Sequence, residues 1–244
     1  MKAQSIDDAF FTKVSYIGAL QDVDWTEGWT NWDCQNTNYP TTTATVGEGT
    51  DTLITGNVTW TSDKVYLLKK FLYVTDGATL TIEPGTIIRG DKTSMGTLII
   101  ERGGKLIAAG TKDKPIIFTS NQPAGLRAWS DWGGVILCGK ATVNQTGGEV
   151  KIEGGPRSMY GGAASPNDND NSGTLQYIRI EFSGYPFQPD KEVNGLTLGG
   201  VGKATTIDHI QVSYCGDDSY EFFGGNVNCK YLISFRTQDD DFDT

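Results

Sequence analysis

The feature that most constrains the fold of this chain is a β-prone phrase that recurs three times near its C-terminal end. The copies begin at Leu175, Ile207 and Cys229, so they are spaced by 207 − 175 = 32 and 229 − 207 = 22 residues. Self-similarity at periods of this size, in glycine-rich and β-branched sequence, is the signature of a solenoid. Because stacked rungs place equivalent residues above one another, the repeat also predicts which side chains become neighbours.

The preceding sequence has the same character. Gly77–Gly85 is echoed by Gly103–Gly110, an offset of 103 − 77 = 26, and short β-prone segments alternate with Gly or Pro. No periodic stretch has the length of a helix, which favours an all-β chain. Mixed repeat lengths of 22, 26 and 32 are typical of rungs whose turns vary while the strands keep their register. A sandwich built on hairpins would instead show many Asn-Gly or Asp-Gly turns. We therefore expect a right-handed parallel β-helix.

The composition divides the chain into three parts. Residues 1–40 are rich in aromatic side chains, and we expect them to form a capping segment or the end of a preceding unit. Residues 41–56 are rich in Thr and Gly and are predicted to be a linker or an irregular strand. Residues 57–244 are predicted to be the β-helix, truncated at its C-terminal end. Gly154–Gly173 is expected to project from the solenoid as a loop, where such folds place function.

Charge and hydropathy exclude several classes of partner. The net charge of −10 and the pI of about 4.6 disfavour binding to nucleic acid or to anionic membranes. No apolar run is long enough to span a bilayer, and the N-terminus has no signal-peptide apolar region. The four cysteines are widely spaced, which disfavours a zinc cluster and leaves disulfides or buried free thiols open.

Tryptophans form the first group of candidate binding residues. Trp25, Trp29 and Trp32 are spaced i, i+4, i+7, which predicts one face of a short helix with Asp24 as its N-cap. They are interpreted either as a sugar-stacking platform or as a cover for the open end of the solenoid. The same two interpretations, stacking on a sugar or packing in a corner, apply to a second pair, Trp129 and Trp132.

Carboxylates form the second group. Two copies of the repeat end in Asp217-Asp218 and in Asp239–Asp241. An offset of 22 stacks Asp217 on Asp239, an offset of 23 shifts the match by one residue, and either brings carboxylates about 4.8 Å apart along the backbone stack. Such groups must be protonated, turned into water or bound to a cation. Clustered oxygens suit Ca²⁺. The candidate metal ligands are Asp217, Asp218, Glu221, Asp239, Asp240, Asp241 and Asp243.

The same carboxylates leave other interpretations open. One is a glycosidase-like acid and base pair, for which the candidates are Asp217, Asp218, Asp239 and Asp240. These phrases resemble the Asp pairs of polygalacturonases, but the Gly-His-Gly and Arg-Ile-Lys motifs of those enzymes are missing. A polysaccharide lyase would also need a base, for which the candidates are Arg179, Lys230 and Arg236. The remaining interpretation is a solvated acidic face whose Asp side chains cap turns.

His209 is the one histidine of the chain. In the repeat it aligns with Tyr177 and Tyr231, which predicts a stacked ladder of rings and a structural role for the imidazole.

Several phrases together resemble a known group of proteins. These are Asn57–Tyr66, Thr79–Gly90, Trp132–Gly139, Cys215–Gly225 and Thr237–Asp243. They are similar to the secreted or lipid-anchored right-handed parallel β-helix surface proteins of Bacteroidetes-type bacteria. The resemblance covers nearly all of residues 57–244 and implies a pectate-lyase-like fold and a surface location, but no mechanism. Residues 10–31 look like the tail that closes such chains, which suggests an excerpt spanning a junction between tandem units.

These observations lead to one expected function and two alternatives. We expect a secreted or bacterial cell-surface β-helix that acts as a non-enzymatic binding or adhesion module, directed at glycans and stabilised by Ca²⁺. The alternatives are a polysaccharide lyase or glycoside hydrolase that uses the stacked Asp cluster, and a structural repeat of a surface fibre. The expected partners are a polysaccharide or cell-surface glycan and tandem or fibre neighbours. Nucleic acid and a transmembrane location are not expected.

Overall fold

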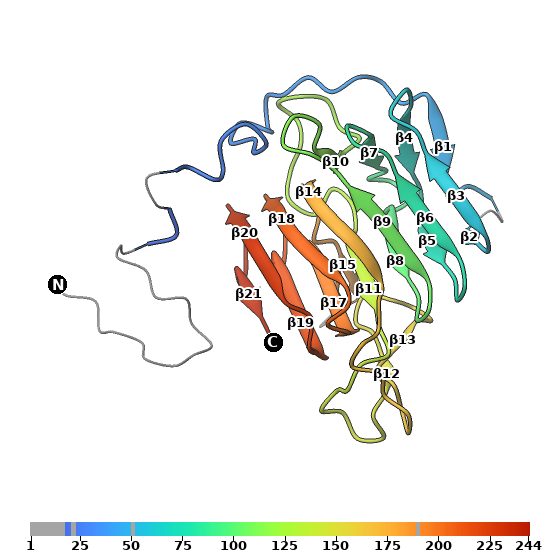
Figure 1. Cartoon of the computed structure of the whole chain (residues 1–244). Coiled ribbons are helices and arrows are strands. Elements are labelled where there is room, and N and C mark those ends of the chain that lie inside the picture. The colour runs from blue at the N-terminus through green and yellow to red at the C-terminus, as the bar shows by residue number, and fades with distance from the viewer. Residues whose placement is uncertain (1–17, 21–22, 50–51, 189–190) are drawn as a thin grey trace.

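The computed structural model describes residues 18–20, 23–49, 52–188 and 191–244. Over these residues the chain is all-β, and its parallel strands stack into a right-handed parallel β-helix (Figure 1). In this described part there is no helix with the length and apolar character needed to cross a membrane.

The rungs have three faces, each a stack of parallel strands. Face 1 consists of β3 (Asn57–Trp60), β6 (Thr79–Ile82), β9 (Lys105–Ala109) and the first halves of β14 (Gly173–Glu181), β18 (Thr206–Ser213) and β20 (Cys229–Phe235). Face 2 consists of β1 (Ala44–Val46), β4 (Val65–Leu68), β7 (Ile87–Gly90), β10 (Ile116–Ser120) and the second halves of β14, β18 and β20. Face 3 consists of β2 (Leu53–Ile54), β5 (Phe71–Val74), β8 (Thr97–Ile100), β11 (Val135–Cys138), β17 (Leu196–Val201), β19 (Tyr220–Gly225) and β21 (Phe242–Asp243).

The strand register follows the repeat lengths of the sequence. Thr79 pairs with Lys105, an offset of 26, and Ile207 pairs with Leu175 and Cys229, offsets of 32 and 22. The prediction that turns vary while strands stay aligned is therefore confirmed. The longest step, 173 − 106 = 67 residues from Leu106 to Gly173, contains a segment inserted between β11 and β14.

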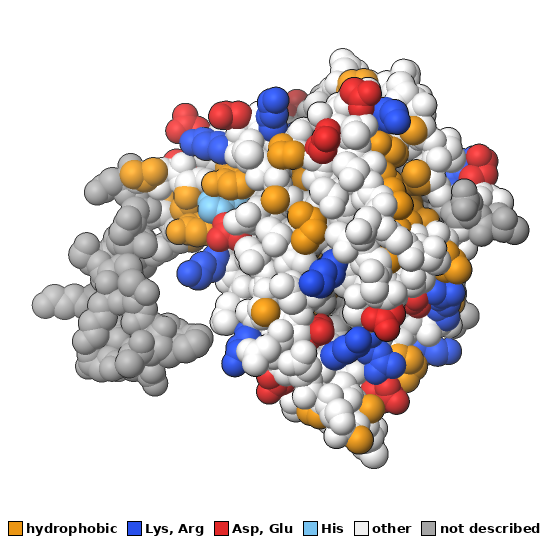
Figure 2. Space-filling model, turned by 45° about the vertical axis from the view of Figure 1, so that its right-hand side comes forward, with side chains coloured by type: hydrophobic (Ala, Val, Ile, Leu, Met, Phe, Trp, Pro, Cys, Tyr) orange, Lys and Arg blue, Asp and Glu red, His pale blue; other side chains and the backbone are white. Residues whose placement is uncertain are grey.

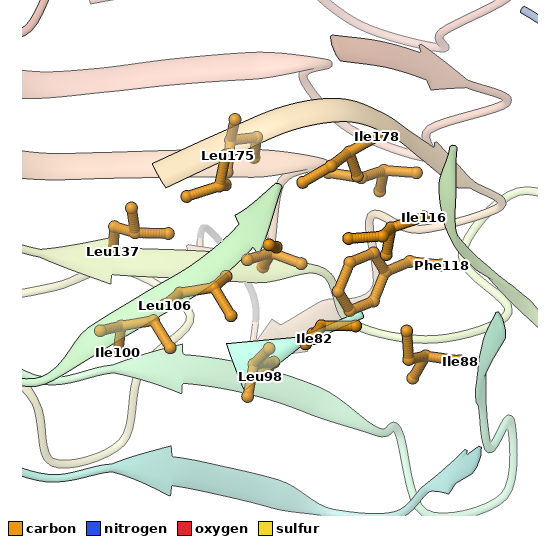
Figure 3. Packing of buried hydrophobic residues seen from close by; sticks show 14 of the residues in the cluster. Ile82, Ile88, Leu98, Ile100, Leu106, Ile116, Phe118, Leu137, Leu175 and Ile178 are labelled. Atoms are coloured by element: carbon orange, nitrogen blue, oxygen red, sulfur yellow. The ribbon is translucent and has the colours of Figure 1, made fainter. Parts of the chain in front are cut away.

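Aliphatic side chains from all three faces fill the interior. Ile82 of face 1, Ile88 of face 2 and Leu98 of face 3 point into one common core (Figure 3). In β6 every second residue is buried, which is the pattern of a strand with one face in the core. β8 and β11 are buried on both sides, because the inserted segment covers their outer surface.

That inserted segment, residues 139–172, folds back onto the outside of face 3. It contains the antiparallel hairpin of β12 (Val150–Lys151) and β13 (Met159–Tyr160), which lies below the solenoid in Figure 1. Ile152 and Tyr160 pack on the outward side chains of Ile99 and Ile136. The loop predicted at 154–173 thus belongs to a larger, partly packed insertion. A second hairpin, β15 (Pro186–Gln188) and β16 (Lys191–Glu192), precedes β17.

The strands β14, β18 and β20 each turn from face 1 to face 2 at one residue. The residue is Tyr177 in β14 (φ +47°), His209 in β18 (φ +54°) and Tyr231 in β20 (φ +54°). A left-handed conformation costs an L-residue about 1–2 kcal/mol. Ring stacking offsets part of that cost, because His209 lies 4.4 Å from the ring of Tyr177 and 4.3 Å from that of Tyr231. The predicted ladder is confirmed.

The helix predicted over Trp25–Trp32 is absent, and the chain forms consecutive turns there. Asp24 still caps the first turn, since its Oδ1 accepts hydrogen bonds from the backbone N–H and the hydroxyl of Thr26. Gly28 has φ of +88°, a conformation that ends a helix. The spacing of the indoles was therefore misleading, because a positive-φ glycine separates the first from the second.

Residues 23–43, here called the strap, run along the side of the solenoid from its last rungs to its first (Figure 1). Trp25 and Trp29 pack against the ladder of His209, and the carbonyl of Pro40 accepts a hydrogen bond from Arg89 on β7. The strap therefore covers a flank of the solenoid. The capping interpretation had expected it to cover an open end instead. Of the predicted capping segment, residues 1–17, 21 and 22 lie outside the described residues.

The β-helix begins earlier than the sequence indicated. Within the predicted linker, β1 pairs with β4 and β2 pairs with β5, so both strands belong to the first rung. Two or three β-prone residues suffice for such a strand when its neighbour supplies the hydrogen bonds. The cysteines are free thiols, with Cys34, Cys138 and Cys215 buried and Cys229 half-buried.

Candidate functional site

The acidic residues of the last two rungs stack with an offset of 22. Tyr220 pairs with Phe242 and Glu221 pairs with Asp243, and the N–H of Ser219 donates to the carbonyl of Asp240 over 3.0 Å. Of the two registers predicted for the carboxylates, this is the one that places Asp217 over Asp239.

Five of the seven predicted metal ligands come together in two groups that share Asp218. One group is Asp217, Asp218 and Asp239, and the other is Asp218, Glu221 and Asp243. In each group the carboxylate oxygens lie within 4.8 Å of one another. The two groups therefore form one continuous acidic cluster across the last turns of face 3.

The two other predicted ligands have different roles. Asp240 donates its backbone N–H to Asp218 over 2.9 Å, so its main chain positions that carboxylate. Asp241 accepts a hydrogen bond from the hydroxyl of Ser234 over 2.5 Å. These two contacts are local hydrogen bonds of the kind expected if Asp side chains cap turns, which was one of the alternatives left open by the sequence.

Burial makes the cluster electrostatically costly. It raises the pKa of Glu221 to about 8 and that of Asp217 to about 7, and neighbouring carboxylates add to both shifts. The pKa of Asp218 is raised for the same reasons. Glu153 of the insertion and Glu192 of β16 contribute further negative charge. Since desolvation and like charges both disfavour the ionised form, these sites favour a proton or a cation.

Asn194 joins the two groups, and sequence reasoning did not identify it. Its Oδ1 accepts from the N–H of Asp218 over 3.2 Å, and its amide donates to a carboxylate oxygen of Glu221. Thr197 pairs with Glu221 one rung away, and its buried hydroxyl has no hydrogen-bond partner among the described residues. The step from β17 to β19 is 220 − 196 = 24 residues. No sequence repeat of that length precedes Tyr220, so the sequence did not indicate that Asn194 lies beside the cluster.

A groove of about 740 Å³ opens beside the acidic cluster. Its lining includes the carboxylates of Glu221 and Asp243, the rings of Tyr160 and Phe223, and the amide of Asn144. The groove thus combines carboxylates, an amide and ring surfaces.

A separate aromatic surface lies on the flank of face 2. Three exposed rings come from three distant segments: Trp32 (49% exposed), Trp129 (40%) and Tyr231 (46%). The half-buried Phe235 and the buried Tyr214 connect Trp32 to Trp129, with centroid distances of 5.1 Å from Trp32 to Phe235, 5.9 Å from Phe235 to Tyr214 and 5.5 Å from Tyr214 to Trp129. Tyr231 lies in a neighbouring group, against Trp25 and His209. Figure 2 shows hydrophobic side chains gathered around the pale-blue histidine on this flank.

Polar groups fix these rings in place. The indole N–H of Trp129 donates to the carbonyl of Arg236 over 2.8 Å, and the guanidinium of Arg236 lies over the rings of Phe235 and Tyr214. Trp25, half-buried, lies 5.2 Å from the ring of Tyr231. The aromatic surface (Trp25, Trp32, Trp129, Tyr214, Tyr231, Phe235) is therefore pre-organised.

Two tryptophans predicted as ligand-binding are structural. Trp29 is buried between the strap, of which it is part, and the rings of Tyr177 and His209, and its indole N–H donates to the carbonyl of Trp25. Trp132 is fully buried, stacks on Phe118 and donates to the carbonyl of Glu181 over 2.8 Å. Both rings are thus packed against other side chains and have almost no exposed surface.

The bases considered for a lyase have other neighbours. Arg179 lies 3.8 Å from Glu181, Arg236 belongs to the aromatic surface, and Lys230 pairs in register with Asp208 on face 1. Arg179 and Arg236 thus have side-chain contacts within the fold, whereas the side chain of Lys230 is exposed.

Comparison with known proteins gives one match. A family model described as a pectate-lyase-like β-helix domain matches residues 52–244. No curated protein and no solved structure matches the chain.

Proposed function

Because the chain belongs to the family of pectate-lyase-like β-helix domains, we propose that it is a non-enzymatic glycan-binding module with a divalent cation, Ca²⁺, in its acidic cluster. The aromatic surface is the observation that carries this proposal. Two exposed rings from distant segments, Trp32 and Trp129, are joined through Phe235 and Tyr214, and exposed large apolar rings grouped in this way mark an interaction site.

The chemistry of the surface suits a sugar. A flat ring carries negative charge on its face, which attracts the positively polarised C–H groups of a pyranose. Arg236 adds a hydrogen-bonding cation at the centre of the surface, which would favour acidic sugars. Rings that other side chains already hold in place lose little conformational freedom on binding.

The cation part of the proposal rests on the acidic cluster. Carboxylates within 4.8 Å of one another match the hard oxygen ligands that Ca²⁺ prefers. Binding would offset the burial and the repulsion between carboxylates that together raise the pKa values of Asp217 and Glu221. The proposal includes an exported location, because polysaccharide ligands lie outside the cell.

The test is binding to a panel of neutral and acidic polysaccharides by affinity electrophoresis. We expect Trp32→Ala and Trp129→Ala to weaken binding, and Leu53→Ala, an exposed apolar residue at the other end of the molecule, to leave it unchanged. Retention of full binding by both tryptophan variants would refute the aromatic surface as the site.

One observation favours a second candidate, a glycoside hydrolase. Glu221, with its pKa raised to about 8, holds a proton at neutral pH and shares the groove with Asp243. A protonated acid beside a second carboxylate is the arrangement that hydrolysis of a glycosidic bond requires. Release of reducing ends from a bound polysaccharide, lost in Glu221→Gln, would establish this activity in place of simple binding.

A further inference from the structure

The inserted segment, residues 139–172, is tied to one edge of face 3 by ion pairs. Where β8 ends, the guanidinium of Arg157 donates to both carboxylate oxygens of Glu101, over 3.0 and 2.6 Å. The next residue, Arg102, donates to Glu149 over 2.6 Å. Each pair joins the solenoid to the insertion, so opposite charges hold this edge closed.

The middle of the insertion packs directly on β17. A Cβ added to Gly199 would lie 2.6 Å from Cδ1 of Ile152, so the lack of a side chain there lets the insertion come this close. Gly154 is equally close to the chain before β17, because a Cβ on it would lie 2.7 Å from the carbonyl oxygen of Glu192. The turn that carries Glu153 therefore lies at the start of β17, at the opposite edge of face 3 from the ion pairs.

At this second edge the insertion brings a carboxylate towards other carboxylates. After burial, the charge of Glu153 is the largest cause of the raised pKa of Glu221, and it also raises the pKa of Asp217, as does Glu192. Lys151 lines the same hollow of about 180 Å³ as Glu153 and adds a positive charge to it. Carboxylates outnumber amino groups in this described set, so repulsion opposes closure of this edge.

A buried hydroxyl lies beside the same carboxylates, on the surface of β17 that faces the insertion. Thr197 is 1% exposed, and its Oγ1 has no hydrogen-bond partner among the described residues. Leu196 and Leu198 lie in the core, so Thr197 is on the outward side of the strand, in register with Glu221. Neighbouring parallel strands are about 4.8 Å apart, which places the hydroxyl next to that carboxylate. A buried polar atom of this kind indicates a ligand that the chain itself does not supply.

We propose that Ca²⁺ binds between the solenoid and the insertion, held by Asp218 and Glu221 on one side and by Glu153 on the other, beside the hydroxyl of Thr197. Binding there clamps the insertion onto face 3. This inference rests on the cation part of the proposed function, to which it adds a ligand from the insertion and a regulatory role. Carboxylate oxygens of Asp218 and Glu221 lie within 4.8 Å of each other. Since Ca²⁺ takes about six to eight oxygens, two carboxylates leave room for a third.

Closure of the insertion shapes the groove beside the acidic cluster. That groove, of about 740 Å³, shares Gln145, Tyr160 and Phe223 with the smaller hollow that Glu153 lines. Gln145 and Tyr160 belong to the insertion, so its position sets the width of the groove. Ca²⁺ therefore regulates access to this groove and leaves the aromatic surface on the flank of face 2 unchanged.

Hydrogen–deuterium exchange of the full chain, with Ca²⁺ and with chelator, tests the clamp. We expect Ca²⁺ to slow exchange in peptides covering residues 148–161 several-fold more than in β6 and β9, because closure protects a segment that opens locally. Glu153→Gln should abolish this protection, while Ca²⁺ still raises the melting temperature through the remaining carboxylates. Glu149→Gln, a matched change in the same segment that alters the pair with Arg102, should keep the protection.

The outcomes separate the clamp from the cation site on which it rests. A higher melting temperature with Ca²⁺ but equal exchange of the insertion in both states would overturn the clamp and leave the cation site standing. Protection that persists in Glu153→Gln would also overturn it. No change in melting temperature would refute the cation site, and the clamp with it.

Thr197→Val tests where in the cluster the cation lies. The change removes the hydroxyl and keeps the shape, so the metal-free chain should be at least as stable as the parent. Calorimetric titration with Ca²⁺ should show a several-fold loss of affinity. A less stable metal-free chain with unchanged affinity would give the hydroxyl a purely structural role and contradict a cation beneath the insertion.

Discussion

The phenol oxygen of Tyr39 lies 2.9 Å from each carboxylate oxygen of Glu181, a residue 142 positions later in the chain. Glu181 is buried beneath the strap, and desolvation raises its pKa. The hydroxyl of Tyr39 therefore donates a hydrogen bond to a buried carboxyl of β14 and offsets part of the cost of burying it. The contact makes the strap part of the folded domain.

Tyr39→Phe should lower the free energy of unfolding by about 1–3 kcal/mol, because it leaves a buried carboxyl without that donor. Urea denaturation measures the change. Tyr185→Phe, which also removes a phenol oxygen, should change stability by less. Equal stability of the two variants would show that the strap contact contributes nothing.

The stability of the metal-free chain should fall as the pH rises from about 4.5 towards 8. The pKa values of Glu221 (about 8) and Asp217 (about 7) exceed their ordinary values of 4.5 and 3.8, so in this window the folded chain holds protons that the unfolded chain has released. Stability from these groups is complete below the ordinary values and is lost through the raised ones. Thermal unfolding across this range should show the slope, and Glu221→Gln should reduce it. A flat profile for the parent chain would contradict the raised pKa values.

Ca²⁺ should raise the melting temperature at neutral pH, and chelator should reverse the rise. Asp239→Ala and Asp243→Ala each remove one exposed carboxylate from one group of the cluster. We expect each to stabilise the metal-free chain slightly by relieving repulsion and to reduce the Ca²⁺ response. Asp113→Ala, at an exposed carboxylate on the turn before β10, is the control. No response of the parent chain to Ca²⁺ would exclude the cation site.

Trp29→Ala and Trp32→Ala should separate packing from binding. Loss of the buried indole of Trp29 should cost about 3–5 kcal/mol of stability, because it leaves a cavity between the strap and the rings of Tyr177 and His209. Loss of the exposed Trp32 should change stability little and reduce polysaccharide binding. Chemical denaturation and affinity electrophoresis of the same two proteins provide both readouts. The reverse pattern would exchange the two roles.

The sequence predicted the stacking of the rungs well, because equivalent residues at offsets of 22, 26 and 32 carry the same local pattern. That information was enough to stack His209 on Tyr177 and Tyr231 and to narrow the carboxylate stack to two registers, of which the structure has the one that brings Asp217 to Asp239. It failed where contacts have no counterpart in a repeat. Asn194 reaches the cluster through a step of a length that occurs once, and the strap reaches its partners through side-chain contacts across more than a hundred residues.

The fates of the tryptophans show the same limit. Spacing alone put Trp25, Trp29 and Trp32 on one face, but the turn at Gly28 and the shape of the flank bury Trp29 and leave Trp32 exposed. Burial depends on which surface the segment meets, and composition does not specify that surface. Of the two interpretations of residues 41–56, the linker was wrong for a related reason, since β1 and β2 are strands only because β4 and β5 pair with them.

The strap also changes how the chain can fold. In a simple solenoid each rung contacts its neighbours alone, so structure can spread from any point and fray from either end. Here the N–H of Asn31 donates to Gln211, 180 residues later, over 2.8 Å. Contacts of such long sequence separation form late and slow the final step of folding. Once formed, they link the segment before the first rung to the last rungs, so the two ends of the array gain and lose structure together.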